Sequence, residues 1–594
     1  MNTHTFHIPV MGIAYTIDTP LKVSRYGMDS VISLVDDILL EKLRKMYCGK
    51  HRLPYAEITN KMSDFRASRI TSYLNLMKEL AEKKFEQFKN ASYEVGGEMK
   101  EYFNMLPDSS EIKRQFMNLT SSILDESKIR KWVSENLSMG SIDVNIMTKL
   151  DKENYVNGEK TPIEFNDAHA ALRGYANSNL NSSIILSAGM SPRLYSYIEQ
   201  FKDFYPNENG YIKKKIVLKV SDYRSAIIQG KFLAKKGLWV SEFRIESGLN
   251  CGGHAFATDG FLLGPILNEF KQNRSEMTST IYDMLVEALD KKNYPIPLEI
   301  PQLKITAQGG VGTADEHDFL INEYELDSVG WGSPFLLVQE ATNVDEQTLE
   351  KLIQSEEKDL YLSNISPLGI PFNNLKGNSK DIERNVHIEK DRPGSSCPKK
   401  FASLNTEFTD KTICTASRQY QHLKIKELQS QDLSPEAYDK EYNKVVEKSC
   451  ICVGLGTAAL LNNDLSTKVE GAGVSVCPGP NMAYFSKEMS LKEITDHIYG
   501  RRNILETTLR PNVFLKELNI YINYLKTKIG EFQLSKSPKQ EKYLKKFSHN
   551  LKEGITYYIS LFQNKNVNKD IQESNIIKDF TASQQELNTL TSDL

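Results

Sequence analysis

The chain has 594 residues, of which 40% are hydrophobic and 25% charged, and its formal net charge is −3. This length predicts two or three domains, and the composition is that of a globular protein with a large core. The slight negative charge excludes the basic surface that nucleic-acid binding needs, and no apolar run is long enough to cross a bilayer.

The first residues, MNTHTFHIPVMG, do not combine a basic region with an apolar stretch, so the sequence predicts no secretory signal. Seven cysteines are an odd number, which fits a reducing compartment better than a disulfide scaffold. We therefore expect a cytoplasmic protein.

Short apolar runs alternate with helical stretches along much of the chain. The first run ends at Met11-Gly12, and the second is MDSVISLV, residues 28–35. Eight such parallel units predict an α/β fold, a closed (β/α)8 TIM barrel, and the alternative is an open doubly wound sheet. The other six expected strands lie in 161–167, 182–189, 214–222, 241–248, 303–310 and 326–333.

The remaining segments show apolar residues at three- and four-residue spacing, which is typical of amphipathic helices. Ser434 and Pro435 are expected to open one of these helices, and the polar residues 583–594 are expected to fray. The predicted organisation is a barrel (1–49 and 159–345), a helical insertion after its second strand (50–158), a helical extension packed on the barrel (346–510), and a C-terminal helix pair with a polar tail (511–594).

Glycine-rich turns follow the last three expected strands, at the end of a barrel where active sites lie. They are Gly252-Gly253-His254, Gln308-Gly309-Gly310 and Gly330-Trp331-Gly332-Ser333. Backbone amides in two neighbouring turns of this kind favour a phosphate group. Alternatively, the glycines only let strands and helices pack closely.

These residues carry a resemblance to a known family. The stretches ESGLNCGGHAFATDGFLLGPI and ITAQGGVGTADEHDFLINEYELDSVGWGSPFLLVQEA resemble the FMN barrels of the nitronate monooxygenase superfamily. Three later segments, CTASRQYQHLKIKEL, SCICVGLGTAAL and CPGPNMAYFSKEM, are similar to one branch, the trans-acting FMN-dependent enoyl reductases of polyunsaturated-fatty-acid and polyketide synthases. The chain departs from both patterns in residues 50–158, in the tail after 510, and at Cys251.

The resemblance implies a set of residues that handle FMN. Gly252 and Gly253 would admit the flavin ring. Lys219 would stabilise negative charge on the reduced flavin, although a lysine at a strand end is as often on the surface. The complete set of implied cofactor-binding residues is Met11, Gly12, Lys219, Gly252, Gly253, Gln308, Gly309, Gly310, Gly332 and Ser333.

His254 is the candidate catalytic residue. Imidazole titrates near neutral pH, so it can take a proton from a carbon acid or give one to an enolate. A nitronate monooxygenase would use the first step, and an enoyl reductase would use the second.

Five of the seven cysteines lie between residues 397 and 477: Cys397, Cys414, Cys450, Cys452 and Cys477. They could bind an iron–sulfur cluster or zinc, but their spacing matches no standard pattern. Buried free thiols are the more common outcome, and the same holds for Cys251.

The resemblance implies an FMN-dependent oxidoreductase, most like an enoyl reductase, acting on an acyl or other carbon-acid substrate in lipid or polyketide metabolism. NAD(P)H is the expected electron donor, and it would have to share the flavin cleft because no second nucleotide-binding motif is present. An acyl-carrier protein or synthase would be the partner, with the insertion 50–158 as a lid or docking surface on the catalytic face. The alternatives are a nitronate monooxygenase-type oxygenase and a non-catalytic flavin-binding or scaffold protein.

Overall fold

Eight parallel strands form a ring in this computed structural model, which describes residues 3–90, 97–122, 126–505, 510–564, 571–592 and 594. A parallel bridge between Ile8 and Ser30 joins the first strand to the second and closes the ring. The predicted (β/α)8 barrel is therefore confirmed, and the open sheet is wrong. Around the ring the strands are β1 (Phe6–His7), β10 (Ser328–Gly330), β9 (Lys304–Gln308), β8 (Val240–Glu246), β7 (Lys214–Val220), β6 (Ser182–Leu186), β3 (Ile142–Ile146) and β2 (Ser30–Ser33).

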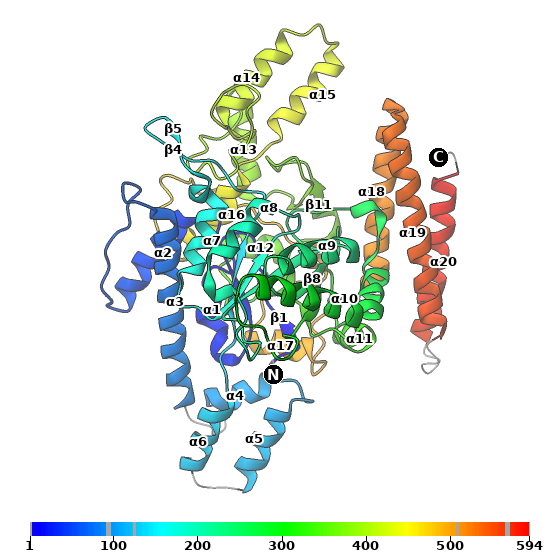
Figure 1. Cartoon of the computed structure of the whole chain (residues 1–594). Coiled ribbons are helices and arrows are strands. Elements are labelled where there is room, and N and C mark those ends of the chain that lie inside the picture. The colour runs from blue at the N-terminus through cyan, green and yellow to red at the C-terminus, as the bar shows by residue number, and fades with distance from the viewer. Residues whose placement is uncertain (1–2, 91–96, 123–125, 506–509, 565–570, 593) are drawn as a thin grey trace.

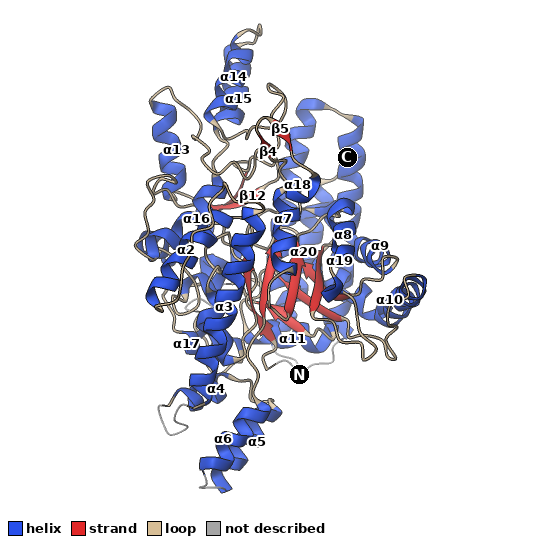
Figure 2. Cartoon of the chain, turned by 60° about the vertical axis from the view of Figure 1, so that its left-hand side comes forward, coloured by secondary structure: helices blue, strands red, loops and turns tan. Residues whose placement is uncertain are grey.

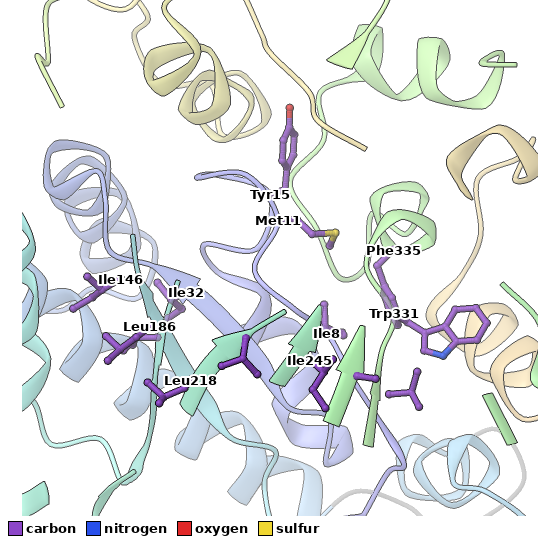
Figure 3. Close-up of a cluster of buried hydrophobic side chains, with 14 of the residues drawn as sticks. Ile8, Met11, Tyr15, Ile32, Ile146, Leu186, Leu218, Ile245, Trp331 and Phe335 are labelled. Atoms are coloured by element: carbon purple, nitrogen blue, oxygen red, sulfur yellow. The ribbon is translucent and has the colours of Figure 1, made fainter. Parts of the chain in front are cut away.

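Branched apolar side chains fill the inside of the barrel (Figure 3). Ile146, Leu186 and Leu218 stand side by side on β3, β6 and β7, because the strand register pairs them directly. Met11 and Tyr15 follow β1 and lie above this layer (Figure 3), which marks the carboxyl end of the strands. The barrel is thus a packed core, and any site must lie on top of it.

The third strand is not where the sequence predicts it. Residues 161–167 form a short 3-10 helix, η2 (Ile163–Phe165), that leads into a helix of the outer layer. The strand at this place in the barrel is β3, which lies between β2 and β6. The range 50–158, predicted as a helical insertion, therefore includes a barrel strand.

Two polar residues conceal β3 in the sequence. Aspartate and asparagine are depleted in strands, so the run Ile142–Ile146 does not read as one. Both side chains are buried and paired: the Asp143 carboxylate accepts a hydrogen bond from the Ser141 hydroxyl, and the Asn145 amide donates one to the Ile185 carbonyl. These bonds make polar residues acceptable in a buried strand.

Helices cover the outside of the barrel (Figure 2). Two of them begin at side-chain caps directly after their strands: the Asp222 carboxylate accepts from the Ser225 amide, and the Thr313 hydroxyl accepts from the Glu316 amide. The helices of this layer are α1 (Thr19–Val23), α2 (Asp37–Lys50), α7 (Asp167–Ala176), α8 (Pro192–Tyr197), α9 (Tyr223–Ala234), α10 (Leu263–Lys291) and α11 (Ala314–Tyr324).

The helices between β2 and β3 extend away from the carboxyl end of the barrel. α3 (Phe65–Lys89) packs along α2 and α7, and then α4 (Glu98–Met105), α5 (Glu111–Ser122) and α6 (Glu126–Asn136) lie beyond the N-terminal end (Figure 1). Their separate aromatic core includes Phe88, Tyr102 and Phe103. The helices α4–α6 lie at the opposite end of the barrel from the catalytic face, so they form no lid over it. The role of the range 50–158 as a docking surface stays a prediction.

Most of the rest of the chain caps the carboxyl end and one side of the barrel (Figures 1 and 2), whereas α17 packs against α4 and α11. Ser434 caps its helix as predicted, by accepting a hydrogen bond from the Ala437 amide. The elements are a hairpin of β4 (Tyr155–Val156) and β5 (Glu159–Lys160), α12 (Glu346–Ile353), a hairpin of β11 (Leu360–Ser363) and β12 (Phe372–Leu375), α13 (Ser379–Glu389), α14 (Arg418–Gln429), α15 (Pro435–Val446), α16 (Ile451–Asn462), α17 (Leu491–Ile498), α18 (Val513–Ser535), α19 (Pro538–Asn564) and α20 (Ile571–Leu590).

The C-terminal residues do not fray as predicted. α20 continues to Leu590, and its buried side chains Phe580 and Leu587 belong to the main core. The ring of Phe580 stacks on Tyr558 of α19, with ring centroids 5.1 Å apart. A few well-spaced apolar residues therefore hold an otherwise polar helix in place.

Among the described residues, no single helix has the length and apolar composition to cross a membrane, although α15 and α16 together meet that test across a 42° bend.

Gly140 precedes β3, where the backbone passes too close to Met28 for any side chain. A Cβ atom at Gly140 would lie 2.1 Å from the Met28 carbonyl oxygen. We expect Gly140→Ala to lower the free energy of unfolding by about 1–3 kcal/mol. Gly530, exposed on α18 with no atom within 4 Å of its Cβ position, is the matched control, and Gly530→Ala should stabilise by about 0.5–1 kcal/mol. Thermal unfolding followed by circular dichroism gives the melting temperatures of both variants. A higher melting temperature for Gly140→Ala than for Gly530→Ala would contradict this expectation.

Candidate active site at the carboxyl end of the barrel

One pocket opens at the carboxyl end of the strands, beneath the C-terminal extension. Every candidate site residue that the sequence predicts lies on its wall. These are Met11, Gly12, Lys219, Gly252, Gly253, His254, Gln308, Gly309, Gly310, Gly332 and Ser333. The structure therefore brings together residues from five of the eight strand ends, while the roles predicted for them remain predictions.

His254 is held between the barrel and the hairpin β11–β12. Its backbone forms an antiparallel bridge with Phe372, and its Nε2 atom lies 2.7 Å from the Ser366 hydroxyl oxygen. Burial, and then the charges of Lys149 and Lys219, lower the pKa of His254 from 6.5 to about 4. The imidazole is therefore neutral at pH 7, and in that state it can accept a proton.

Lys219 faces the pocket and not the outer surface. Its Nζ atom lies 3.0 Å from Glu246 Oε1, and that same carboxylate oxygen accepts a hydrogen bond of 2.7 Å from the Gln308 amide. The three residues stand at the ends of β7, β8 and β9, which are neighbours in the barrel. The interpretation of Lys219 as a surface lysine is wrong, since only 16% of its side chain is exposed.

The turns after β9 and β10 present backbone amides to the pocket. No described residue accepts a hydrogen bond from the amides of Gly309, Gly310, Gly332 or Ser333. Such amides at the start of helical turns bind phosphate well, because their N–H groups point at the ligand. The Ser333 hydroxyl accepts a 2.8 Å hydrogen bond from the Gly479 amide, which leaves its proton free to donate.

Close packing within the chain explains three of the glycines. A Cβ atom at Gly252 would lie 2.5 Å from the Cys477 carbonyl oxygen, one at Gly309 would lie 2.5 Å from the Cys251 sulfur, and one at Gly310 would lie 2.0 Å from the Asn250 amide nitrogen. Gly253 is different, because its Cβ position is in open space and its φ is +76°. A ligand can therefore approach the backbone at Gly253, whereas Gly252 is already covered by the chain.

Two polar atoms of the pocket wall have no partner among the described residues. They are the two ends of the Asn250 side-chain amide, the oxygen and the nitrogen, both fully buried. Buried polar atoms are almost always hydrogen-bonded in folded proteins. These two atoms therefore indicate a polar ligand in the pocket.

The sequence alone did not identify five residues of the site, one of which is Asn250. Lys149 follows the strand that was misplaced, and its Nζ atom lies 3.8 Å above the ring of Phe256. A correct prediction of β3 would have placed Lys149 in the loop at the carboxyl end of that strand, and so in the site. Ser366 and Asn481 come from the C-terminal extension, where no sequence pattern marks them as facing the barrel. Glu246 could have been predicted from the sequence, because it is the last residue of β8 and directly precedes the glycine turn.

Cys251 is not a nucleophile in this setting. Its thiol donates a 3.3 Å hydrogen bond to the Gln308 carbonyl, and burial raises the pKa of Cys251 well above its usual value. The thiol therefore stays protonated at neutral pH.

No protein-family model matches the chain, and no curated protein matches its sequence. Among solved structures, FabK from Thermotoga maritima is 13% identical with a TM-score of 0.30, over 68% of this chain and 86% of that chain. The enoyl reductase domain of MlnA, from the macrolactin biosynthesis cluster of Bacillus amyloliquefaciens, is 16% identical with a TM-score of 0.32, over 71% of this chain and 89% of that chain. At these values the likenesses carry no argument about function, and the barrel rests on the strand pairing above.

Proposed function

We propose that the chain is an FMN-dependent oxidoreductase of the enoyl reductase type. The observation that carries the proposal is the composition of the pocket. Unpaired backbone amides lie at one side, a lysine–carboxylate pair at its floor, and a neutral histidine on its wall. This is the arrangement of a site that binds a phosphorylated cofactor beside a group able to move a proton.

The residues present fit FMN. The amides of Gly309, Gly310, Gly332 and Ser333 would hold the phosphate, and the unpaired side-chain amide of Asn250 would bond to the polar edge of the ring. Lys219 places a positive charge at the barrel mouth, where it stabilises negative charge on a bound group. The chemistry that FMN supplies when bound is hydride transfer, with NAD(P)H as the proposed electron donor.

The other walls of the pocket are apolar, which fits an acyl chain as substrate. The apolar lining comes from the ends of β2 and β3, from the segment after Ser366 and from α16. It consists of Val35, Met147, Leu150, Leu368, Phe372, Ile451 and Leu455. Such a surface excludes water and favours a hydrocarbon chain. We propose in addition that the acyl chain is delivered as a thioester on a carrier protein.

His254 would hold the proton that the reaction moves. Ser366 fixes the Nε2 side of the ring, so the imidazole keeps one orientation. Burial is the main cause that lowers the pKa of His254, and the charges of Lys149 and Lys219 come second. A bound anion would oppose the two lysine charges and raise the pKa in part. Protonation of the substrate carbon by His254 would therefore depend on what the pocket holds.

A nitronate monooxygenase-type reaction is the second candidate. The specific observation that favours it is the lowered pKa of His254, since a neutral imidazole is ready to remove a proton from a nitroalkane. In that reaction the flavin would be reoxidised by oxygen, with no need for NAD(P)H.

The purified full-length protein is expected to show flavin absorption and to release free FMN on heating. We further expect it to oxidise NAD(P)H rapidly only when an enoyl thioester is present. Nitroalkane turnover without NAD(P)H would instead support the second candidate. A colourless protein that does not take up added FMN would overturn both and leave a scaffold role.

A further inference from the structure

One lysine on the pocket wall has no partner of opposite charge. The wall contains three charged side chains, those of Lys149, Lys219 and Glu246. Lys219 and Glu246 form an ion pair, so their charges balance. Among the described residues no carboxylate pairs with Lys149, and the charge that acts on it is the positive one of Lys219. The wall therefore carries one positive charge in excess.

The surrounding chain holds Lys149 in place. Its Nζ atom lies 3.8 Å from the centre of the Phe256 ring, and the negative face of an aromatic ring attracts an ammonium group. The turn after β6 makes room for the lysine stem, because a Cβ atom at Gly189 would lie 3.2 Å from Lys149 Cε. A half-buried ammonium group without a carboxylate is unfavourable unless a ligand completes its bonding. Lys149 therefore indicates that a ligand brings an oxygen atom to this place.

The phosphate that we place at the glycine turns is remote from this lysine. Lys149 follows β3, whereas those turns follow β9 and its neighbour β10. Around the ring of strands, β6, β7 and β8 separate β3 from β9 on one side, and β2, β1 and β10 separate them on the other. The two sites therefore stand across the barrel mouth from each other. A second polar group, one that does not belong to the phosphate, must meet Lys149.

Lys149 is a neighbour of His254. His254 and Phe256 stand two residues apart in the loop after β8, and Lys149 contacts the ring of Phe256. Of the two lysine charges that lower the pKa of His254, that of Lys149 has the larger effect. In an enoyl compound the carbonyl oxygen and the α-carbon are two bonds apart. A group that binds this oxygen must therefore lie beside the group that protonates this carbon, as Lys149 lies beside His254.

We propose that Lys149 is a second catalytic residue, whose ammonium group binds the carbonyl oxygen of an α,β-unsaturated acyl substrate. The inference rests on the proposed function, because reduced FMN supplies the hydride. As the hydride adds to the β-carbon, the electron pair of the C=C bond moves toward the carbonyl group and leaves a negative charge on its oxygen. The α-carbon then takes a proton from His254, and the saturated acyl chain is neutral again.

The surroundings of Lys149 strengthen its effect on that charge. Met147 and Leu150 flank it in the chain and line the same wall, so they exclude water from its ammonium group. A cation that is fixed in place before the reaction stabilises a developing charge more strongly in such a site than in water. The substrate class thereby narrows to alkenes that are conjugated with a carbonyl group.

Binding of an acyl carboxylate tests the lysine without any turnover. Hexanoate carries a negative oxygen on an apolar chain, and hexanamide has the same chain without the charge. By isothermal titration calorimetry on the full-length protein as purified, Lys149→Met should weaken hexanoate binding about 10–100-fold and change hexanamide binding by less than about twofold, because only a hydrogen bond to a charged group is lost. Lys149→Arg keeps the charge and should recover most of the affinity. Lys440→Met, an exposed lysine of α15, is the matched control and should change neither constant.

Turnover of an enoyl thioester is the second readout. Lys149→Met should lower kcat about 10²–10³-fold, which is the effect of removing one group that stabilises an oxyanion, with a smaller change in KM. The FMN content of the variant should equal that of the wild type, because the glycine turns are unchanged.

Equal hexanoate affinity of the wild type and Lys149→Met would overturn the inference, and so would a variant kcat within about threefold of the wild-type value. Either result leaves the proposed function standing if the wild type holds FMN and reduces the thioester. A wild type without FMN and without thioester turnover would overturn the proposed function, and with it the catalytic role of Lys149. The wild type alone suffices if the variants do not fold: it should bind hexanoate at least about tenfold more tightly than hexanamide, and equal affinities would overturn the inference.

Discussion

Replacing His254 by glutamine is expected to lower turnover by about 10²–10⁴-fold while leaving bound flavin in place. In the proposed reaction the imidazole on the pocket wall would move the proton, whereas the amides that would hold the phosphate come from the turns after β9 and β10. Glutamine keeps a polar group near Ser366 but cannot take up a proton. Steady-state rates and flavin content of the same preparation measure the two effects separately.

The matched control is His549→Gln, since His549 is an exposed histidine of α19 that does not line the pocket. Its rate should equal that of the wild type. If the His254 variant kept more than about a third of the wild-type rate, His254 would not be the proton-moving residue. Loss of flavin together with activity would assign His254 to binding and not to catalysis.

The pH dependence of the rate distinguishes the two directions of proton transfer. The pKa of His254 is lowered to about 4, so the imidazole is neutral from about pH 5 upward. If His254 removes a proton, the rate should rise as pH increases through about 4 and be level from pH 6 to 8. If it donates one, the rate should fall about tenfold per pH unit above the pKa, unless a bound anion raises the pKa into that range.

Sequence reasoning identified the parts of the site that follow strands and missed those that come from elsewhere. The glycine turns after β8, β9 and β10 were recognisable because such turns are rare after apolar runs. Ser366, Phe372 and Asn481 face the pocket only because the C-terminal extension folds back over the barrel, and no local pattern indicates that. Contacts between residues so far apart along the chain leave no recognisable pattern in a single sequence.

The sequence also does not show why a glycine is needed at a given position. Gly252 and Gly253 are adjacent and were expected to serve the same ligand. In the structure Gly252 makes room for the carbonyl of Cys477, and only Gly253 faces open space. The same limit applies to β3, whose Asp143 is acceptable in a strand because of a hydrogen bond that only the folded chain provides.

Gly332→Asp is expected to weaken FMN binding by about 10³-fold without disturbing the fold. Gly332 has a φ of −102°, outside the left-handed region, and the nearest atom to its Cβ position is Pro9 Cγ at 3.4 Å. A side chain there is therefore tolerated by the protein but enters the turn that would hold the phosphate. A carboxylate about 4 Å from the phosphate costs about 4 kcal/mol at an effective dielectric constant of about 20, which corresponds to about 10³ in Kd.

Two further variants separate charge from bulk. Gly332→Ala adds a methyl group without charge, so its Kd for FMN should rise by only about tenfold. Gly49→Asp places the same charge near the end of α2, where nothing lies within 4 Å of the Cβ position, and should leave binding unchanged. Fluorescence titration with FMN gives the three constants, and melting temperatures show whether each variant is folded. Equal Kd values for Gly332→Asp and the wild type would place the phosphate away from β10. A carboxylate next to a phosphate in a half-buried turn repels it and must weaken binding.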